Sequence, residues 1–210
     1  MQTNIKVLAT FFILFLVGIS SYADSWAYPK VTRYYSEDSS HMLKVVPKYI
    51  PEKYNNWVTA KPKRKRKFTA QDTTIIPCHA ILYKINGSKD TVEIWNKKLI
   101  NRIAPVTVLV SNDGKRIVTL DNWHSMGHGL DVFAVYSEHG ELINRFQLDD
   151  FSVFPLNDYE FSVSSIWWRC GAEILNEQQN VKICMKTSDD REDTILFNLK
   201  TYKFEKTHNK

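Results

Sequence analysis

The chain has 210 residues, which is enough for one compact domain or two very small ones. Its 28 Lys and Arg residues against 23 Asp and Glu residues give a formal net charge of +5, and 43% of the residues are hydrophobic. This composition excludes a globally disordered chain. A polytopic membrane protein is also excluded, because the one long apolar stretch lies at the N-terminus. The pattern of the whole sequence predicts an all-β domain outside the cytoplasm.

Residues 1–23 have the three parts of a secretory signal. A short polar start is followed by the apolar run Val7–Ile19, and Ser21-Tyr22-Ala23 places small residues at the two positions that a signal peptidase reads. The apolar run is shorter than the roughly 20 residues that a membrane-spanning helix needs. We therefore expect cleavage after Ala23 and a secreted or periplasmic protein. The alternative is an uncleaved N-terminal anchor.

Residues 24–77 are predicted to form a polar and basic N-terminal segment with few strands. His41–Val46 is its one predicted strand. Six cations stand within seven residues: Lys61, Lys63, Arg64, Lys65, Arg66 and Lys67. Because like charges repel and cannot be buried together, this run predicts an exposed loop, and it is suited to contact with an anionic surface. No aromatic residue interrupts the run, so no nucleic-acid partner is expected.

Residues 78–210 are predicted to form an antiparallel β domain. Short β-branched and aromatic runs alternate there with turn sequences such as Asn86-Gly87, and no convincing helical period occurs. This spacing predicts either a stack of propeller-blade-like sheets or a β-sandwich. The predicted strands are Ala80–Ile85, Thr91–Trp95, Val106–Val110, Arg116–Asp121, Asp131–Ser137, Glu141–Leu148, Tyr159–Trp168, Val181–Lys186, Thr194–Leu199 and Tyr202–Glu205.

One stretch of this domain has a more specific pattern. Pro105–Asp121 consists of a strand, an Asp-Gly turn and a second strand, and Asp131–Tyr136 with the following Gly140-Glu-Leu forms a closing hairpin. The segment 105–148 thereby resembles a β-propeller blade of the YVTN and TolB type, which is common in secreted bacterial proteins. Weaker echoes of the closing strand occur at Thr91–Trp95 and Thr194–Phe197, with aromatic residues at Trp95, Tyr136 and Phe197. The resemblance implies a sheet architecture but no activity and no site.

Three cysteines follow the signal sequence, so one of them is left without an intramolecular partner if a disulfide forms. A hairpin centred on Glu177 would set Cys170 opposite Cys184, and we predict a disulfide between these two with Cys78 free. A one-residue shift in register would separate the two sulfurs. The alternative is three buried free thiols.

The loop Asn122–Leu130 holds the densest group of chemically active side chains. Asp121 and Asp131 flank it, and His124 and His128 lie within it. Imidazoles and carboxylates are ordinary zinc ligands, so these four residues are the weak metal-site candidates. The spacing matches no standard metal motif, and we expect an ordered surface loop with Trp123 packed on the sheet and both histidines solvated.

The sequence carries no catalytic or cofactor-binding signature, since it has neither a Gly-x-Ser-x-Gly elbow nor a phosphate-binding glycine loop. Our prediction is an exported, non-enzymatic β domain that binds a protein or an envelope component, without a cofactor. The alternative is an extracytoplasmic metal-dependent hydrolase that uses the 121–131 loop. A third hypothesis is a structural subunit of an envelope assembly, joined through an exposed edge strand.

Overall fold

The computed structural model describes residues 26–49, 75–87 and 90–206. The described chain is all-β, as predicted, with two short 3-10 turns at Leu148–Asp150 and Leu156–Asp158. Within these residues, no helix has the length and apolar character needed to cross a bilayer. The expected signal peptide at 1–23 and the basic run at 61–67 lie outside the described residues.

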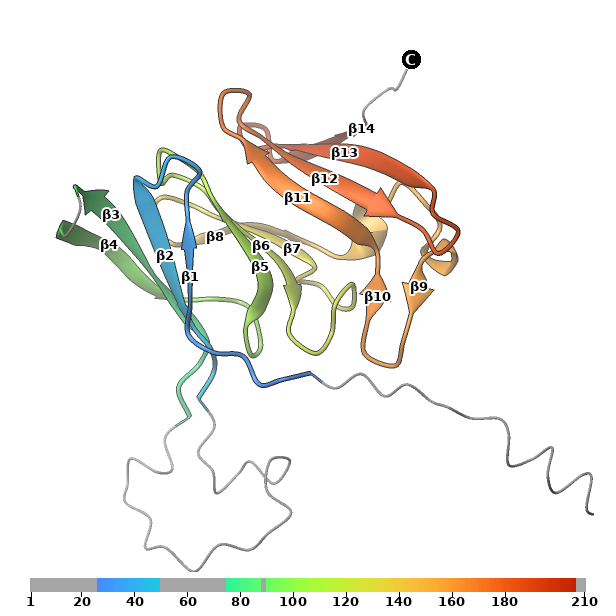
Figure 1. Ribbon diagram of the computed structural model, residues 1–210, viewed down its shortest axis with the longest axis horizontal. Coiled ribbons are helices and arrows are strands. Elements are labelled where there is room, and N and C mark those ends of the chain that lie inside the picture. The colour runs from blue at the N-terminus through green and yellow to red at the C-terminus, as the bar shows by residue number, and fades with distance from the viewer. Residues whose placement is uncertain (1–25, 50–74, 88–89, 207–210) are drawn as a thin grey trace, which may run out of the picture.

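Twelve of the strands form three four-stranded antiparallel sheets, each built from strands consecutive in the sequence (Figure 1). Sheet 1 contains β1 (Thr32–Tyr35), β2 (His41–Val46), β3 (His79–Asn86) and β4 (Asp90–Lys98). Sheet 2 contains β5 (Pro105–Val110), β6 (Ile117–Asn122), β7 (Phe133–Tyr136) and β8 (Leu142–Phe146). Sheet 3 contains β11 (Arg169–Leu175), β12 (Asn180–Lys186), β13 (Glu192–Asn198) and β14 (Lys203–Lys206).

Sheet 1 spans the boundary that the sequence placed between residues 77 and 78. Strand β2 pairs with β3 in antiparallel register, with Val45 opposite Ala80. The alternating burial of β2 explains its place, because Leu43 and Val45 enter the core while their neighbours stay partly exposed. The unpredicted strand β1 has the sequence TRYY, whose side chains are mostly exposed, so it lacks the apolar alternation that marks a half-buried strand.

Sheet 2 lies between the other two sheets, and this explains why β6 and β7 are buried at every residue. Successive side chains of a strand point to opposite faces of the sheet. Ile117 and Tyr136 therefore pack on one face in a cluster with sheet 1, while Val118 and Phe133 pack on the other face in a cluster with sheet 3. The second cluster is rich in aromatic residues, with the rings of Phe133 and Phe197 4.7 Å apart.

The aromatic echoes noted in the sequence are not all equivalent in the fold. Tyr136 lies in β7 and Phe197 in β13, which are the third strands of sheets 2 and 3. Trp95 lies in β4, the fourth strand of sheet 1. The blade-like segment 105–148 does form one four-stranded sheet.

The prediction of a single strand over Tyr159–Trp168 is wrong. Two short strands, β9 (Glu160–Phe161) and β10 (Ile166–Trp167), form a hairpin there instead. The chain reverses between them through a turn in which the Ser162 amide donates to the Ser165 carbonyl. Three serines in this turn favour local hydrogen bonding over a continuous strand.

Candidate binding groove

Asp121, the first of the four metal-ligand candidates, is fully buried and already saturated with donors. Its carboxylate accepts hydrogen bonds from the Gly127 amide (2.8 Å), the Trp168 indole N–H (2.9 Å) and Arg169 Nε (3.0 Å). Burial raises the pKa of Asp121 above its usual value, although the charge of Arg169 and the hydrogen-bond donors act in the opposite direction. This carboxylate fastens sheet 2 to the start of sheet 3, and its oxygen atoms face protein donors.

The other three candidates point elsewhere. His124 and His128 are both exposed, as predicted. Asp131 forms an ion pair with Arg145 at 3.3 Å. Trp123 packs against Tyr28 of the N-terminal segment, and its indole donates to the Ala27 carbonyl at 2.9 Å. Because the four candidates do not converge, the structure gives the metal-dependent hydrolase no ligand set on this loop.

The predicted disulfide between Cys170 and Cys184 is confirmed, with a Cα–Cα distance of 5.3 Å. The register differs by one residue from a hairpin centred on Glu177, because Gly171 stands opposite Cys184. An irregularity between Arg169 and Gly171 makes Cys170 the extra residue of a bulge, and this brings its sulfur back within reach of Cys184. The bond indicates an oxidising, extracytoplasmic compartment.

The disulfide also makes metal binding impossible at the one cluster of three potential metal ligands found among the described residues. Cys170, Cys184 and Glu192 bring one ligand-type atom each within 4.8 Å of one another. Since both sulfurs are bonded to each other, no thiolate is present to bind a metal ion.

Cys78 is free, as predicted, and it is buried in the core between sheets 1 and 2. Burial raises the pKa of its thiol to about 12. A thiol is a weak nucleophile until it ionises, so Cys78 is a packing residue and not a reactive one.

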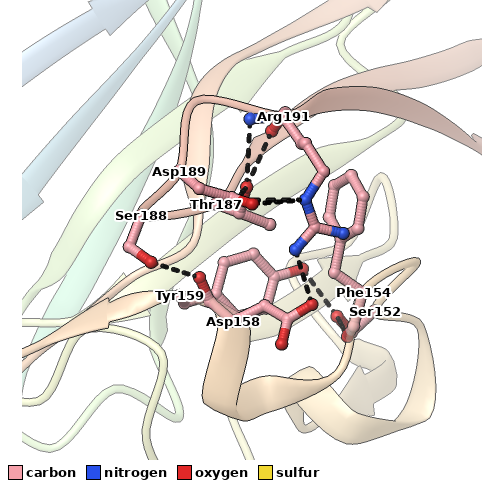
Figure 2. Close-up of polar contacts among 8 residues, drawn as sticks. All are labelled: Ser152, Phe154, Asp158, Tyr159, Thr187, Ser188, Asp189 and Arg191. Carbon is pink, nitrogen blue, oxygen red and sulfur yellow. Dashed lines mark hydrogen bonds and ion pairs between the residues drawn. The ribbon is translucent and has the colours of Figure 1, made fainter.

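A second polar cluster joins the turn 187–191 of sheet 3 to the preceding loop (Figure 2). Arg191 lies between two carboxylates, with Nη2 2.8 Å from Asp158 and Nε 2.9 Å from Asp189. Its guanidinium also lies over the ring of Phe154, 5.2 Å from the centroid. Ser188 donates to the Asp158 carbonyl through both its amide and its hydroxyl, each at 2.9 Å. The cation is neutralised on two sides, so the cluster fastens two segments and offers no anion site.

A groove lies among the first strands of the three sheets. Strands β1 and β11 both contact β5, and each of the three pairs with a neighbouring strand along one edge only within the described chain. Near the start of these strands Arg169 Nη2 donates to Thr107 Oγ1 at 2.9 Å and holds β11 against β5. Beyond that contact a groove of about 800 Å³ lies between the sheets, and it is lined by β5, β11 and the turns at their far end. Figure 1 shows the three sheets whose first strands surround it.

Three turns close the far end of the groove through hydrogen bonds. The Asn112 amide in the β5–β6 turn donates to Asn176 Oδ1 in the β11–β12 turn at 2.9 Å. Asn176 Nδ2 donates to Glu37 in the β1–β2 turn at 2.9 Å, and the Asp38 amide donates to Asn112 Oδ1 at 3.2 Å. One side chain from each sheet therefore meets at this end, which fixes the width of the groove.

The groove combines an apolar floor with an acidic border. Val108, Leu109 and Ile174 contribute apolar surface. Four carboxylates belong to the wall, and no Lys or Arg lines it among the described residues; these carboxylates are Glu37, Asp38, Glu173 and Glu177. Glu173 is partly neutralised by Lys182 from β12 at 3.0 Å. The arrangement suits an extended ligand with apolar and cationic side chains.

Sequence reasoning missed this groove for a physical reason. Its walls come from β1, β5 and β11, which lie far apart in the sequence, and its carboxylates come from the β1–β2 turn, from β11 itself and from the β11–β12 turn. The local signals were ordinary, since Glu and Asp at turns are common. The sequence contained one signal for the groove, the repeat of a four-stranded unit. Equivalent turns of successive units lie at the same end of the fold and can therefore meet there.

No protein-family model matches the sequence, and no curated protein matches it either.

Proposed function

We propose that this protein is an exported, non-enzymatic binding module whose groove takes an extended cationic segment of an envelope protein. The N-terminal signal sequence and the Cys170–Cys184 disulfide support the compartment. The cationic segment Lys61–Lys67 supports a second kind of partner in this proposal, an anionic surface.

The observation that carries the proposal is the pairing pattern around the groove. Within the part of the chain that the structure describes, β5 and β11 each have one unpaired edge beside the groove of about 800 Å³, and four carboxylates border it. A free strand edge binds an added strand through main-chain hydrogen bonds, and the flanking pockets select alternate side chains. The apolar floor favours aliphatic residues on one face of such a strand, and the carboxylates favour Lys or Arg next to them.

We also propose that the three sheets are blades of an open propeller-like stack of the YVTN and TolB type. Three successive four-stranded meanders with adjacent first strands support this architecture. In such a stack the first strands surround the binding surface, in agreement with the groove. Three sheets do not close a ring that typically needs four to eight blades, so the groove stays open on one side.

The test is peptide binding measured by isothermal titration calorimetry. An extended peptide of alternating Lys and Val residues is expected to bind, and its Glu-Val counterpart is not. Reversing the charge of two groove residues, Glu173→Lys with Glu177→Lys, is expected to weaken binding about tenfold, since each exposed charge contact contributes roughly 0.2–1 kcal/mol.

The matched control is Glu93→Lys with Glu141→Lys, which reverses two exposed carboxylates outside the groove. It has the same net charge as the groove variant. Equal weakening in both variants, or no binding by the unaltered protein, would contradict the proposal.

A further inference from the structure

Sheets 1 and 3 are the two ends of the stack, and each has one face that no other described sheet covers (Figure 1). Sheet 1 packs on sheet 2 through side chains such as Leu43 and Leu82. Sheet 3 packs on the opposite side of sheet 2 through side chains such as Val181 and Ile183. Because successive side chains of a strand point to opposite faces, the residues between these form the uncovered faces. We call the two faces outer face 1 and outer face 3, after their sheets.

Strand pairing makes outer face 1 one continuous surface across all four strands of sheet 1. It places Tyr35, Met42, Tyr83 and Glu93 in one row, and Arg33, Lys44, Ile81 and Asn96 in the next. Directly opposite side chains on paired strands have Cβ atoms roughly 4.5–5.5 Å apart, so the members of each row are neighbours. Tyr35 is 54% exposed, and Met42 and Tyr83 are half-buried. Outer face 1 therefore presents an apolar row to its surroundings.

Outer face 1 also holds two cations that the described chain does not neutralise. Arg33 and Lys44 stand directly opposite each other on paired strands. Like charges in this arrangement destabilise a sheet. Neither side chain forms an ion pair with another described residue. A partner that brings carboxylates to this face would remove the repulsion.

Outer face 3 has two rows that are equivalent to those of outer face 1. One row contains Glu173, Lys182, Leu196 and Glu205, and the next contains Leu175, Asn180, Asn198 and Lys203. Arg33 and Glu173 each stand two residues before the end of the first strand of their sheet, so their rows lie at the same level. On the third strands of these rows, Ile81 in one face corresponds to Leu196 in the other.

The charges of the equivalent rows are complementary. Arg33 and Lys44 give their row a net charge of +2, whereas two Glu against one Lys give the Glu173 row a net charge of −1. In the second rows, Glu93 on outer face 1 corresponds to Lys203 on outer face 3. Complementary charge patterns fix which surfaces associate and in which register. Outer face 3 of a second copy therefore has the chemistry that outer face 1 lacks.

The number of sheets also favours a second copy as the partner. Closed propellers typically contain four to eight blades. The described chain supplies three four-stranded sheets, so two copies supply six and three copies would supply nine. Two is thus the number of copies that falls within the typical range. A head-to-tail contact forms a closed ring when its rotation closes, and here it would continue the sheet-on-sheet packing within the chain.

The area of the two faces is sufficient for a stable dimer. With strands about 4.8 Å apart and a rise of about 3.3 Å per residue, four strands of about six residues cover roughly 400 Å². A ring of two copies buries four such faces, or roughly 1,600 Å² in total, which is the usual area of a specific interface.

We propose that two copies of this chain close a six-bladed ring, in which outer face 1 of each copy packs on outer face 3 of the other. Arg33 approaches the partner's Glu173, and Glu93 approaches the partner's Lys203. The first strands of all six sheets surround the ring axis, so both grooves open toward it. The inference rests on the propeller-like architecture proposed above and is independent of the ligand that the groove binds.

The first test is the mass of the exported protein by sedimentation velocity, which should equal that of a dimer. Met42→Lys with Tyr83→Glu keeps the net charge and sets opposite charges directly across two paired strands, so sheet 1 should still fold. The same two charges would be buried in the dimer contact, so the dissociation constant should rise at least tenfold. The matched control, Phe161→Lys with Val163→Glu on the exposed β9–β10 hairpin, should leave the dimer unchanged. Circular dichroism checks that both variants keep their strands.

The second test is cross-linking, which reports which faces meet. Glu93→Cys and Lys203→Cys are prepared separately, mixed to exchange subunits and treated with a bismaleimide that spans about 10 Å, the distance between packed sheets. Cross-linked dimer is expected from the mixture and from neither variant alone. Cys78 is buried and the other two cysteines form a disulfide, so the native cysteines should not react.

Four results would overturn the ring. These are a monomer in sedimentation, equal loss of the dimer in the hairpin control, cross-linking within either cysteine variant alone, and no cross-linking in the mixture. A monomer that still binds the Lys-Val peptide would refute the ring and leave the groove proposal intact. A dimer that does not bind the peptide would do the opposite.

Discussion

Two arginine–aspartate pairs fasten sheet 3 to its surroundings, and they differ mainly in burial. In the pair of Arg169 and Asp121, the two side chains are 14% and 0% exposed. In the pair of Arg191 and Asp158, they are 50% and 29% exposed (Figure 2). The buried pair joins two sheets beside the groove and shares its carboxylate with Trp168, whereas the exposed pair joins a turn to a loop.

This difference predicts unequal energetic importance for similar geometry. Charges removed from water must be fully paired, so removal of one partner leaves an uncompensated buried charge. Charges in contact with water lose little when a partner is removed, because solvent replaces it. We therefore expect the Arg169–Asp121 pair to determine how sheets 2 and 3 meet. We expect the Arg191 cluster to contribute little to the free energy of unfolding.

The largest effect is expected from Asp121→Ala. This variant leaves Arg169 Nε and the Trp168 indole without an acceptor, removes the carboxylate that neutralises Arg169, and should lower the free energy of unfolding by about 3–5 kcal/mol. Urea denaturation followed by tryptophan fluorescence measures the loss. The double variant Asp121→Asn with Arg169→Met, which removes both charges at similar volume, should recover much of it. A loss below about 1 kcal/mol for Asp121→Ala would show that the two pairs are equivalent.

The Cys170–Cys184 disulfide should have the next largest effect, and it provides a covalent comparison within sheet 3. The half-cystines are 14 residues apart, and closure of a loop of about this size stabilises by roughly 3 kcal/mol. Cys170→Ser with Cys184→Ser should therefore lower the unfolding free energy by about 3 kcal/mol in urea without reductant. Reducing agent should destabilise the unaltered protein and leave this variant unchanged. Identical curves for the unaltered protein with and without reductant would contradict the prediction.

Cys78 extends the comparison to a buried group that has no charged partner. Burial raises the pKa of its thiol from 9.0 to about 12. The folded state therefore holds the proton more tightly, and this contribution to stability is complete below pH 9 and is lost as the pH rises toward 12. The expected slope is about 1.4 kcal/mol per pH unit between those limits. Cys78→Ala should be less stable at neutral pH but should lack this part of the alkaline decline, and equal slopes would refute the assignment.

The smallest effect on the free energy of unfolding is expected from Arg191→Ala, because its guanidinium is in contact with water and solvent replaces its lost partners. The matched control is Arg145→Ala, which removes the partner of Asp131 in another exposed pair. Thermal unfolding of both variants by circular dichroism should show similar small changes. If Arg191→Ala alone destabilised the protein as much as Asp121→Ala, the Figure 2 cluster would have the importance that we assign to Asp121.

The sequence predicted the fold well wherever local rules decide the structure. Period-two runs separated by Asn-Gly or Asp-Gly turns identified β3–β4 and β5–β6, because both signals are local. Strand β1 was missed because its side chains at the edge of sheet 1 are mostly exposed and carry no alternation. The disulfide was predicted correctly with a register one residue off, and the bulge at Cys170 compensated for the difference.

The sites were harder to predict, because they depend on tertiary contacts. Alternation along β6 would place Asp121 on the same face as Ile117, but its φ of 61° breaks that alternation, and its carboxylate meets Trp168 and Arg169 of the sheet 3 region. No local pattern shows that its partners lie 47 and 48 residues away. The groove likewise exists only because three distant turns meet through Asn112 and Asn176.

Hydrogen–deuterium exchange with and without the Lys-Val peptide tests the binding groove most directly. If the peptide adds a strand to a free edge, amides of Val108–Val110 or Ala172–Leu175 should become protected, while those of the β9–β10 hairpin should not change. Binding without protection in either strand, or protection confined to the β9–β10 hairpin, would contradict the groove as the binding site.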